Sequence, residues 1–295
     1  MKKRLLSAFM ALVLCMTLLP APALAAETEN NVAVQANTAN VAEVTIDGTT
    51  KQYTNIVDAF DAAQGAESAT VKPVKLLTDV TISSNDHYGI KLESGNITLD
   101  LNSCTIQTTG GASGFVPLNA VFYISGGGSL TVQDSGTGGK IEQPNAGQAI
   151  GVSYGNLTVK NGTIEVTSTA TDQDSDATQN CAVLVRGSGV ADIQGGTLIG
   201  NRGIYIGGRF GGGTLSVSGG TIHGKNSYAL WVVGGSAALS GGTYTTGLEN
   251  GCSIYNSAGT AAALLDSGYR FESEGSESKY SDDTHGVVGD TTVAV

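Results

Sequence analysis

The sequence predicts an all-β protein: a right-handed parallel β-helix of about six or more coils with a short capping α-helix at its N-terminal end. Three observations support this prediction. A Gly-Thr unit recurs along the chain, as in LTVKNGTIEV at 157–166 and LSVSGGTIHG at 215–224. An apolar stretch recurs between the copies, as in GIYIGG at 203–208. No repeat carries a helical pattern of apolar residues, and no hairpin signal joins its strands.

The chain begins with the pattern of a secretory signal peptide over residues 1–25. MKKR is a basic head, the apolar run extends from Leu5 to Leu19, and ALA at 23–25 is a small-residue cleavage site. The run is short for a bilayer span and no later segment is long enough, so we expect no membrane span. We expect a secreted, extracellular protein that can stay associated with the cell surface.

The charge of the chain excludes some partners. Its 26 acidic and 15 basic residues give a formal net charge of −11. Residues 1–25 hold three basic residues and no acidic ones, so their removal changes the charge from −11 to −14. A field of that sign does not attract nucleic acid or anionic lipid. Calcium, cationic partners and neutral glycans fit better.

A capping helix is predicted near residues 54–63, after a linker over 26–41 and at the start of a β-helix domain over 42–271. Its expected N-cap is Thr54. The apolar residues on one face of this helix are Ile56, Val57, Phe60 and Ala63. This face would cover the open apolar end of the stack, and the sequence TVKPVKLLTDVTI that follows would form the first coil.

The coils follow from the alignment of the Gly-Thr copies. The aligned positions are Thr105, Lys140, Thr163, Thr197, Thr221 and Thr243. The intervals are 35, 23, 34, 24 and 22 residues, and the two long ones contain inserts at 110–119 and 169–180. Without the inserts the period is about 22–24 residues, within the range of stacked repeat folds. Each repeat then holds three short strands with apolar residues inward and glycines at the corners.

The C-terminal end is expected to have two parts. The segment AAALLDSGYRF at 261–271 can shield the last coil from solvent. Residues 272–295 are polar and acidic, and we expect them to form a loosely ordered tail.

This organisation resembles the pectin-lyase-like superfamily of right-handed parallel β-helices and, more narrowly, secreted surface proteins of gut Gram-positive bacteria. The resemblance is carried by the cap helix with LLTDVTI, by NLTVKNGTI and TLSVSGGTI, and by the closing LLDSGYRF. It implies the fold and leaves the function open, because this fold hosts lyases, hydrolases, adhesins and capsid spikes. The sequence lacks the site motifs of the catalytic members, since His223 has no paired Asp nearby.

Acidic residues gather in one predicted outward column. Aligned residues of neighbouring coils lie about 4.8 Å apart, and this column contains Gln107, Glu142, Glu165, Ile199, His223 and Thr245. Glu142 and Glu165 would approach to about 5 Å, the carboxylate separation of retaining glycosidases. Asp172, Asp174 and Asp176 follow in a loop, so these five residues are candidate calcium ligands. The simpler interpretation is a solvated acidic face, and no catalytic residue is assigned.

Aromatic residues form a second predicted outward column. Its members are Tyr123, Gly151, Leu184, Tyr205, Trp231 and Ser253. Rigid outward aromatic side chains stack on sugar rings or anchor a protein partner. The candidate ligand-binding residues are therefore Tyr123, Leu184, Tyr205 and Trp231, with Arg186 alongside. The alternative is an aromatic ladder that stabilises the sheet or lies under a loop.

These observations predict a secreted, non-catalytic β-helix that binds a glycan or a host or cell-wall protein, with calcium as the sole candidate cofactor. Two alternatives stay open: a polysaccharide lyase or glycoside hydrolase, and a structural spacer. An acidic groove beside a basic residue would favour the enzyme. An exposed aromatic strip would favour the binding protein, and smooth polar faces would favour the spacer.

Overall fold

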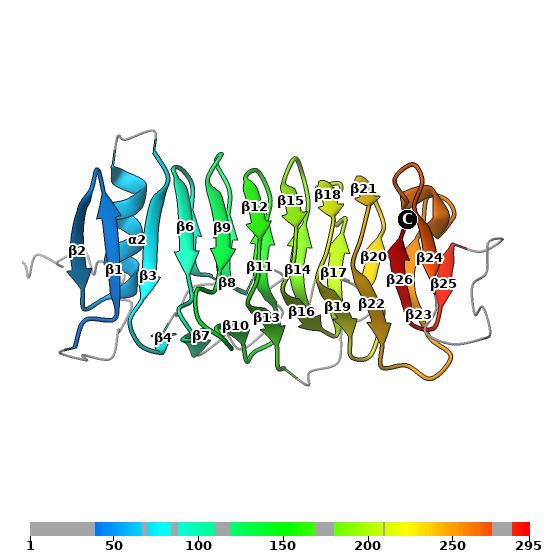
Figure 1. Cartoon of the computed structure of the whole chain (residues 1–295), viewed down its shortest axis with the longest axis horizontal. Helices are drawn as coiled ribbons and strands as arrows, with labels where there is room; N and C mark the ends of the chain where they lie inside the picture. Colours follow the sequence, from blue (N-terminus) through cyan, green and yellow to red (C-terminus); the bar gives the residue numbers. More distant parts are fainter. Residues whose placement is uncertain are drawn as a thin grey trace, which may run out of the picture. The chain divides into compact units, whose positions relative to one another are not determined.

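A computed structural model of the 295-residue chain describes residues 39–66, 70–83, 88–109, 119–168, 180–208, 210–272 and 285–295. The predicted signal peptide and most of the predicted linker lie outside these ranges. The described residues form three sheets whose strands stack side by side along one axis (Figure 1). No helix within these ranges has the length and apolar composition that a membrane span needs.

Within each sheet, the strands that are neighbours in space come from successive turns of the chain. Sheet A contains, in spatial order, β2 (Thr49–Tyr53), β1 (Ala42–Ile46), β3 (Lys72–Leu76), β6 (Asn96–Asp100), β9 (Ser129–Gln133), β12 (Asn156–Val159), β15 (Val190–Ile193), β18 (Thr214–Val217) and β21 (Ser236–Leu239). Sheet B contains β24 (Arg270–Glu272), β26 (Thr291–Ala294), β22 (Thr243–Thr246), β19 (Thr221–Gly224), β16 (Thr197–Gly200), β13 (Thr163–Val166), β10 (Lys140–Gln143), β7 (Thr105–Thr109) and β4 (Val80–Ser83). Sheet C contains β25 (Gly286–Val288), β23 (Cys252–Asn256), β20 (Leu230–Val232), β17 (Arg202–Ile206), β14 (Cys181–Val185), β11 (Gln148–Val152), β8 (Ala120–Ile124) and β5 (Tyr88–Leu92).

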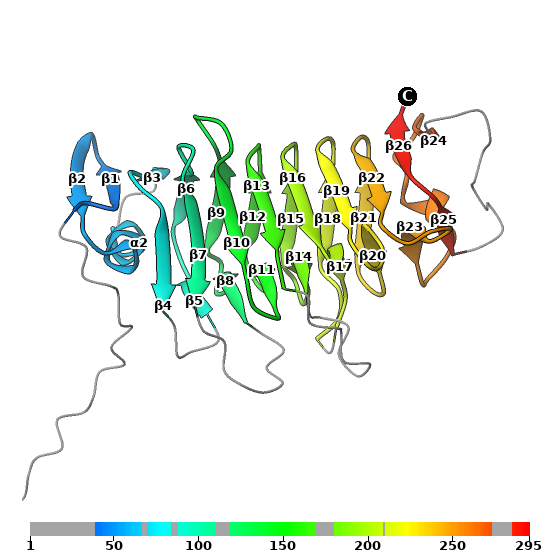
Figure 2. The same ribbon diagram turned by 90° about the horizontal axis from the view of Figure 1, so that it is seen from below.

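The chain passes through sheets A, B and C in turn, so three consecutive strands make one coil (Figure 2). The 21 strands from β3 to β23 therefore make seven coils in the described part of the chain. Strands of neighbouring coils pair in parallel, as β12 does with β15 and β13 with β16. This is a parallel β-helix, and it confirms the predicted fold class of about six or more coils with a short N-terminal helix.

The strand register matches the repeat alignment. In sheet B, Thr163 pairs with Lys140 and with Thr197 on the two neighbouring coils. Pairing then continues from Thr197 to Thr221 and on to Thr243. The residues predicted to point inward are buried in one continuous apolar core: Leu157, Val159, Ile193, Leu215 and Val217.

Glycines make the corners before the sheet B strands. Gly162, Gly196, Gly220 and Gly242 directly precede those strands, with φ of 89°, 84°, 91° and 94°. This left-handed region is open to glycine and costly for other residues. The Gly-Thr unit therefore recurs because the corner requires glycine and the strand that follows favours a β-branched residue.

The N-terminal end of the stack is covered by α2 (Ile56–Gly65). Its buried face is Ile56, Ala59, Phe60 and Ala63, and the Phe60 ring lies 5.4 Å from the Phe122 ring. The N-cap is Asn55, whose side chain accepts a hydrogen bond from Val57 N at 2.8 Å. The prediction of Thr54 was therefore wrong by one residue. Strands β1 and β2 add an antiparallel hairpin beside β3 that the repeat pattern did not predict.

The C-terminal end differs from its prediction. A 3₁₀ helix, Ala261–Leu264, buries Ala261 and Leu264 at the last coil, as the shielding role of 261–271 predicted. The expectation of a loosely ordered tail is wrong for residues 285–295. Strand β25 pairs antiparallel with β23, and β26 pairs antiparallel with β22 and β24. They dock because Val287 and Val293 are buried against the core.

Candidate functional site

The acidic column of sheet B has the predicted register. Glu142 pairs with Glu165 on the next coil, and it pairs with Gln107 on the coil before. The column continues through Ile199 and His223 to Thr245. Repeat alignment alone therefore placed the two carboxylates on adjacent coils.

Two lysines neutralise these carboxylates. Lys140 Nζ lies 3.4 Å from Glu142 Oε2 and 3.0 Å from Glu165 Oε2. Lys225 Nζ lies 2.8 Å from Glu165 Oε1. Glu142 also accepts a hydrogen bond from Thr167 Oγ1 at 3.3 Å. The column is thus an ion-pair network across several coils, with Glu165 held by a lysine on each side.

The protonation of Glu165 does not suit a general acid. Burial raises the pKa of its carboxyl, but hydrogen bonds from Lys225 and Lys140 outweigh burial and bring the pKa below its usual value. The pKa of Lys140 is raised, chiefly by its hydrogen bond to Glu165. A glycosidase acid needs a carboxyl whose pKa is raised. Glu165 therefore acts as a fixed anion in an ion pair.

The five candidate calcium ligands are not brought together in the described part of the chain. Asp172, Asp174 and Asp176 lie outside the described residues. The carboxylates of Glu142 and Glu165 face lysines, and no group of three or more His, Cys, Asp or Glu among the described residues is placed to hold a metal ion. Calcium binding by this loop stays a prediction.

The ion pairs of Glu165 predict an acid-dependent loss of stability. Because the folded-state pKa is below the usual 4.5, the carboxylate stabilises the fold above about pH 4.5 and this contribution is lost as the pH falls further. We expect Glu165→Gln to unfold more easily than the wild type at pH 7. The difference in unfolding free energy should narrow as the pH falls below about 4.5.

Urea unfolding at a series of pH values measures this difference. Glu249→Gln is the matched control, because Glu249 is exposed and has no ion pair in the described ranges. The unfolding free energy of this control should change with pH as that of the wild type does. If the difference in unfolding free energy between Glu165→Gln and the wild type stays constant down to about pH 3, the ion pairs of Glu165 do not stabilise the fold as proposed.

The aromatic column of sheet C faces outward from the coil, as predicted. Leu184 pairs with Tyr205, and Tyr205 pairs with Trp231, on consecutive coils. They pack with Cys181 in a cluster separate from the main core. The last member is Tyr255, which pairs with Trp231, whereas the predicted Ser253 is fully buried. Gly224 pairs with Thr246 and Leu230 pairs with Ile254, so six positions on one coil correspond to eight on the next, and the alignment missed this shift of two.

The predicted exposure was wrong for Leu184, Tyr205 and Arg186, whereas Tyr123 and Trp231 are half-buried. Leu184 and Tyr205 are only 1% and 3% exposed, and Arg186 is 6% exposed. The rings of Tyr205 and Trp231 pack edge to face with centroids 5.2 Å apart. The column from Leu184 to Tyr255 therefore fits the aromatic-ladder interpretation. Direct ligand contact by Leu184 and Tyr205 would require their covering groups to move.

Arg186 joins residues from several coils. Its Nε donates to Ser153 Oγ at 2.8 Å, and its Nη2 donates to the Tyr123 hydroxyl at 3.3 Å. The Tyr123 hydroxyl in turn donates to Ser153 Oγ at 3.0 Å. The guanidinium carbon lies 5.8 Å from the ring centre of Tyr123 and 5.3 Å from that of Phe210. Of the predicted site residues, Tyr123 and Arg186 are thus in contact.

Two exposed aromatic residues near Arg186 were missed. Tyr154 and Phe210 are 53% and 61% exposed, in the turns that follow β11 and β17. A Cβ on Gly187 would lie 3.2 Å from the Tyr154 ring, so this ring packs against the turn after Arg186. The sequence pattern that could have identified them is an aromatic residue directly before a glycine in a turn, as in SYG at 153–155 and RFG at 209–211.

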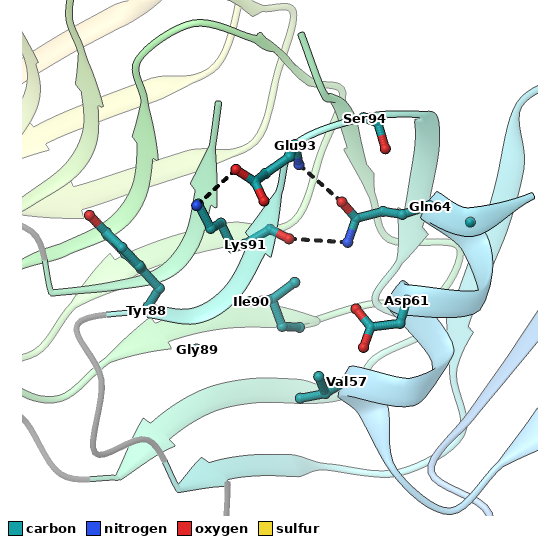
Figure 3. Close-up of a pocket in the computed structure, with 10 residues that line it drawn as sticks. Val57, Asp61, Gln64, Tyr88, Gly89, Ile90, Lys91, Glu93 and Ser94 are labelled. Carbon is teal, nitrogen blue, oxygen red and sulfur yellow. Dashed lines mark hydrogen bonds and ion pairs between the residues drawn. The ribbon is translucent and has the colours of Figure 1, made fainter. Parts of the chain in front are cut away.

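A pocket of about 540 Å³ lies between α2 and β5 (Figure 3). It is lined by Val57, Asp61, Gln64, Gly65, Tyr88, Gly89, Ile90, Lys91, Glu93 and Ser94. Gln64 of α2 connects the two walls of the pocket, because it donates to Lys91 O at 3.1 Å and accepts from Glu93 N at 3.0 Å. Lys91 Nζ lies 2.8 Å from Glu93 Oε1. The pocket therefore combines the apolar side chains of Val57 and Ile90 with polar side chains, several of which are exposed.

Tyr88 links this pocket to the Arg186 cluster. Its ring stacks on Tyr123, with centroids 4.3 Å apart and planes 13° from parallel. Burial and, to a lesser extent, Tyr123 raise the pKa of Tyr88 to about 12, so its hydroxyl is neutral at physiological pH. Burial, followed by Asp58, raises the pKa of Asp61. Sequence reasoning missed this pocket because it forms only when the cap helix packs beside β5.

Comparisons of the chain with protein-family models, curated proteins and solved structures gave no significant match. The assignment of the fold as a parallel β-helix therefore rests on strand order and register.

Proposed function

We propose that this protein is a secreted, non-catalytic β-helix that binds a saccharide in the pocket between α2 and β5. One observation carries the proposal: an aromatic ring, Tyr88, shares the pocket with Asp61, Gln64, Lys91 and Glu93. Sugars present an apolar face of C–H groups and a rim of hydroxyls. Aromatic rings suit that face, and carboxylate, amide and ammonium groups suit the hydroxyls.

The size and rigidity of the pocket support the same proposal. A volume of about 540 Å³ falls within the usual range for small-ligand sites. The two hydrogen bonds of Gln64 hold α2 against β5 before any ligand arrives. A preformed site loses little ordering entropy on binding, which favours measurable affinity for a weakly binding ligand such as a sugar.

The location and wider relationship of the protein belong to the same proposal. The signal-peptide pattern at 1–25 and the acidic composition support secretion and contact with a glycan or cell-surface partner. The parallel β-helix supports membership of the pectin-lyase-like superfamily, since that superfamily shares this architecture.

Substitutions in the pocket should weaken saccharide binding. A glycan array with the purified mature chain first identifies a ligand, and calorimetry then measures its affinity. We expect Tyr88→Ala to lower that affinity at least about tenfold, because the stacking ring is lost. Asp61→Asn should lower it by a smaller factor, and Tyr154→Ala is the matched control outside the pocket. Unchanged affinity of a folded Tyr88→Ala variant would rule out this pocket as the site.

A polysaccharide lyase or glycoside hydrolase is the second candidate, and the same pocket favours it. Burial, followed by Asp58, raises the pKa of Asp61, and Glu93 lines the same pocket. A carboxyl of raised pKa that shares a site with a second carboxylate is the pairing that glycosidases use. Product analysis of the bound saccharides separates the two functions. Turnover that disappears in Asp61→Asn would favour the enzyme. Neither binding nor turnover would favour the structural spacer.

A further inference from the structure

Arg186 is a buried cation without an ionic partner in the described part of the chain. It is 6% exposed, and the ion pairs among the described residues do not include it. Two hydroxyls and two aromatic rings surround it instead. Hydroxyls and ring faces compensate a desolvated cation only in part. An anion at this position would therefore be bound favourably.

The hydrogen bonds of Arg186 leave one binding edge open. A guanidinium group has five N–H donors, and Ser153 and Tyr123 occupy the edge formed by Nε and Nη2. Nη1 donates to no described residue. It is also not fully enclosed, whereas the indole nitrogen of Trp231 is enclosed and has no partner in the described part of the chain. The edge formed by Nη1 and Nη2 thus remains for a ligand. A planar carboxylate fits such an edge with two parallel hydrogen bonds.

The position of Arg186 is fixed before any ligand arrives. Its backbone forms an antiparallel bridge with Gly212, and Gly187 N donates to Gly211 O at 3.1 Å. This pairing brings the turn that carries Phe210 onto the turn that carries Arg186. The guanidinium therefore lies over the ring of Tyr123 and over the ring of Phe210.

The surroundings select the kind of anion. Arg186 supplies one positive charge, whereas the whole chain has a formal net charge of −11. One cation neutralises a monoanion, but the negative field of the chain repels the second charge of a phosphate dianion. The exposed rings of Phe210 and Tyr154 flank the site and offer apolar contact. A carboxylate carried close to an aromatic ring satisfies both features.

We propose that Arg186, with Tyr123, Ser153 and Phe210, forms a binding site for a carboxylate ligand that carries an aromatic ring. The ligand is either a free aromatic acid or a peptide whose C-terminal residue is aromatic. The site is formed by Tyr123 of β8 and by the turns after β11, β14 and β17, whereas the saccharide pocket is lined by the cap helix and β5. Tyr123 stacks on Tyr88 of that pocket, but the two sites take ligands of different chemistry. The two proposals can therefore fail separately.

The test compares phenylacetate with phenylacetamide, which has the same shape and no charge. We expect the Nε–H resonance of Arg186 to shift on titration with phenylacetate, with much weaker effects from phenylacetamide. The affinity should fall with added salt. N-acetyl-glycyl-phenylalanine and its C-terminal amide form the second arm. Tighter binding of the peptide acid than of phenylacetate assigns the peptide source, and the reverse assigns the free acid.

Substitutions test whether Arg186 binds the carboxylate group of the ligand. Arg186→Lys keeps the charge and loses the two-point edge, so phenylacetate affinity should fall at least about tenfold. Phe210→Ala keeps the arginine and should weaken binding several-fold even if the Arg186 variant is unstable. Arg270→Gln, at an exposed arginine outside the site, should bind as the wild type does. Equal affinity for phenylacetate and phenylacetamide, or full phenylacetate affinity in folded Arg186→Lys, would overturn the proposal.

Discussion

Replacing Phe60 by alanine should lower the free energy of unfolding by about 3–5 kcal/mol. Phe60 is fully buried in α2, where its ring packs against that of Phe122 at 5.4 Å. The substitution leaves a cavity at the point where the cap helix closes the apolar end of the first coils. Ile56, Ala59 and Ala63 of the same face cannot fill that volume, because each is already packed in the core.

Urea unfolding followed by circular dichroism measures this loss. Phe210→Ala is the matched control, because it removes the same atoms from a side chain that is 61% exposed. The control should change the free energy of unfolding by less than about 1 kcal/mol. A loss of that small size in Phe60→Ala itself would mean that α2 does not close the stack.

Removing residues 285–295 should have an effect of similar size. Val287 and Val293 are buried, and full burial of a valine contributes about 1.5–3 kcal/mol, so the deletion should cost about 3–6 kcal/mol. It also removes Thr291, whose Oγ1 donates to Glu272 O at 3.0 Å. The last strands β22 and β23 would then lose their antiparallel partners and expose open edges.

The truncated chain should therefore unfold at lower urea concentration and self-associate, which size-exclusion chromatography detects. Deletion of Val295 alone is the control, because this residue is 76% exposed and follows the last strand. Truncation after residue 284 with unchanged stability and elution volume would show that β25 and β26 are dispensable for closing the stack.

The repeat allowed the fold and the register to be predicted from the sequence. In a parallel stack each repeat interval is one coil, so aligned residues such as Glu142 and Glu165 become direct neighbours. The alternation of apolar residues along a strand then shows which side chains enter the core. Both inferences depend on short-range periodicity, which a single sequence displays directly.

The environment of the outward residues could not be predicted in the same way. Alternation placed Tyr205 and Leu184 outside the main core, but it carries no information about what covers them. The pocket beside Tyr88 needs contacts between α2 and β5, and the C-terminal closure needs β26 to pair with strands earlier in the chain. Such contacts lie outside the repeat, so no periodic pattern marks them.

The coil-by-coil register has a consequence for the kinetics of folding. Tyr205 and its neighbour Trp231 are only 26 residues apart in a chain of 295, and folding is faster when contacting residues are close in the sequence. Each new coil needs closure of only one short loop on a template that is already formed. An all-β chain of this kind is expected to nucleate at any pair of adjacent coils and to grow outward in both directions.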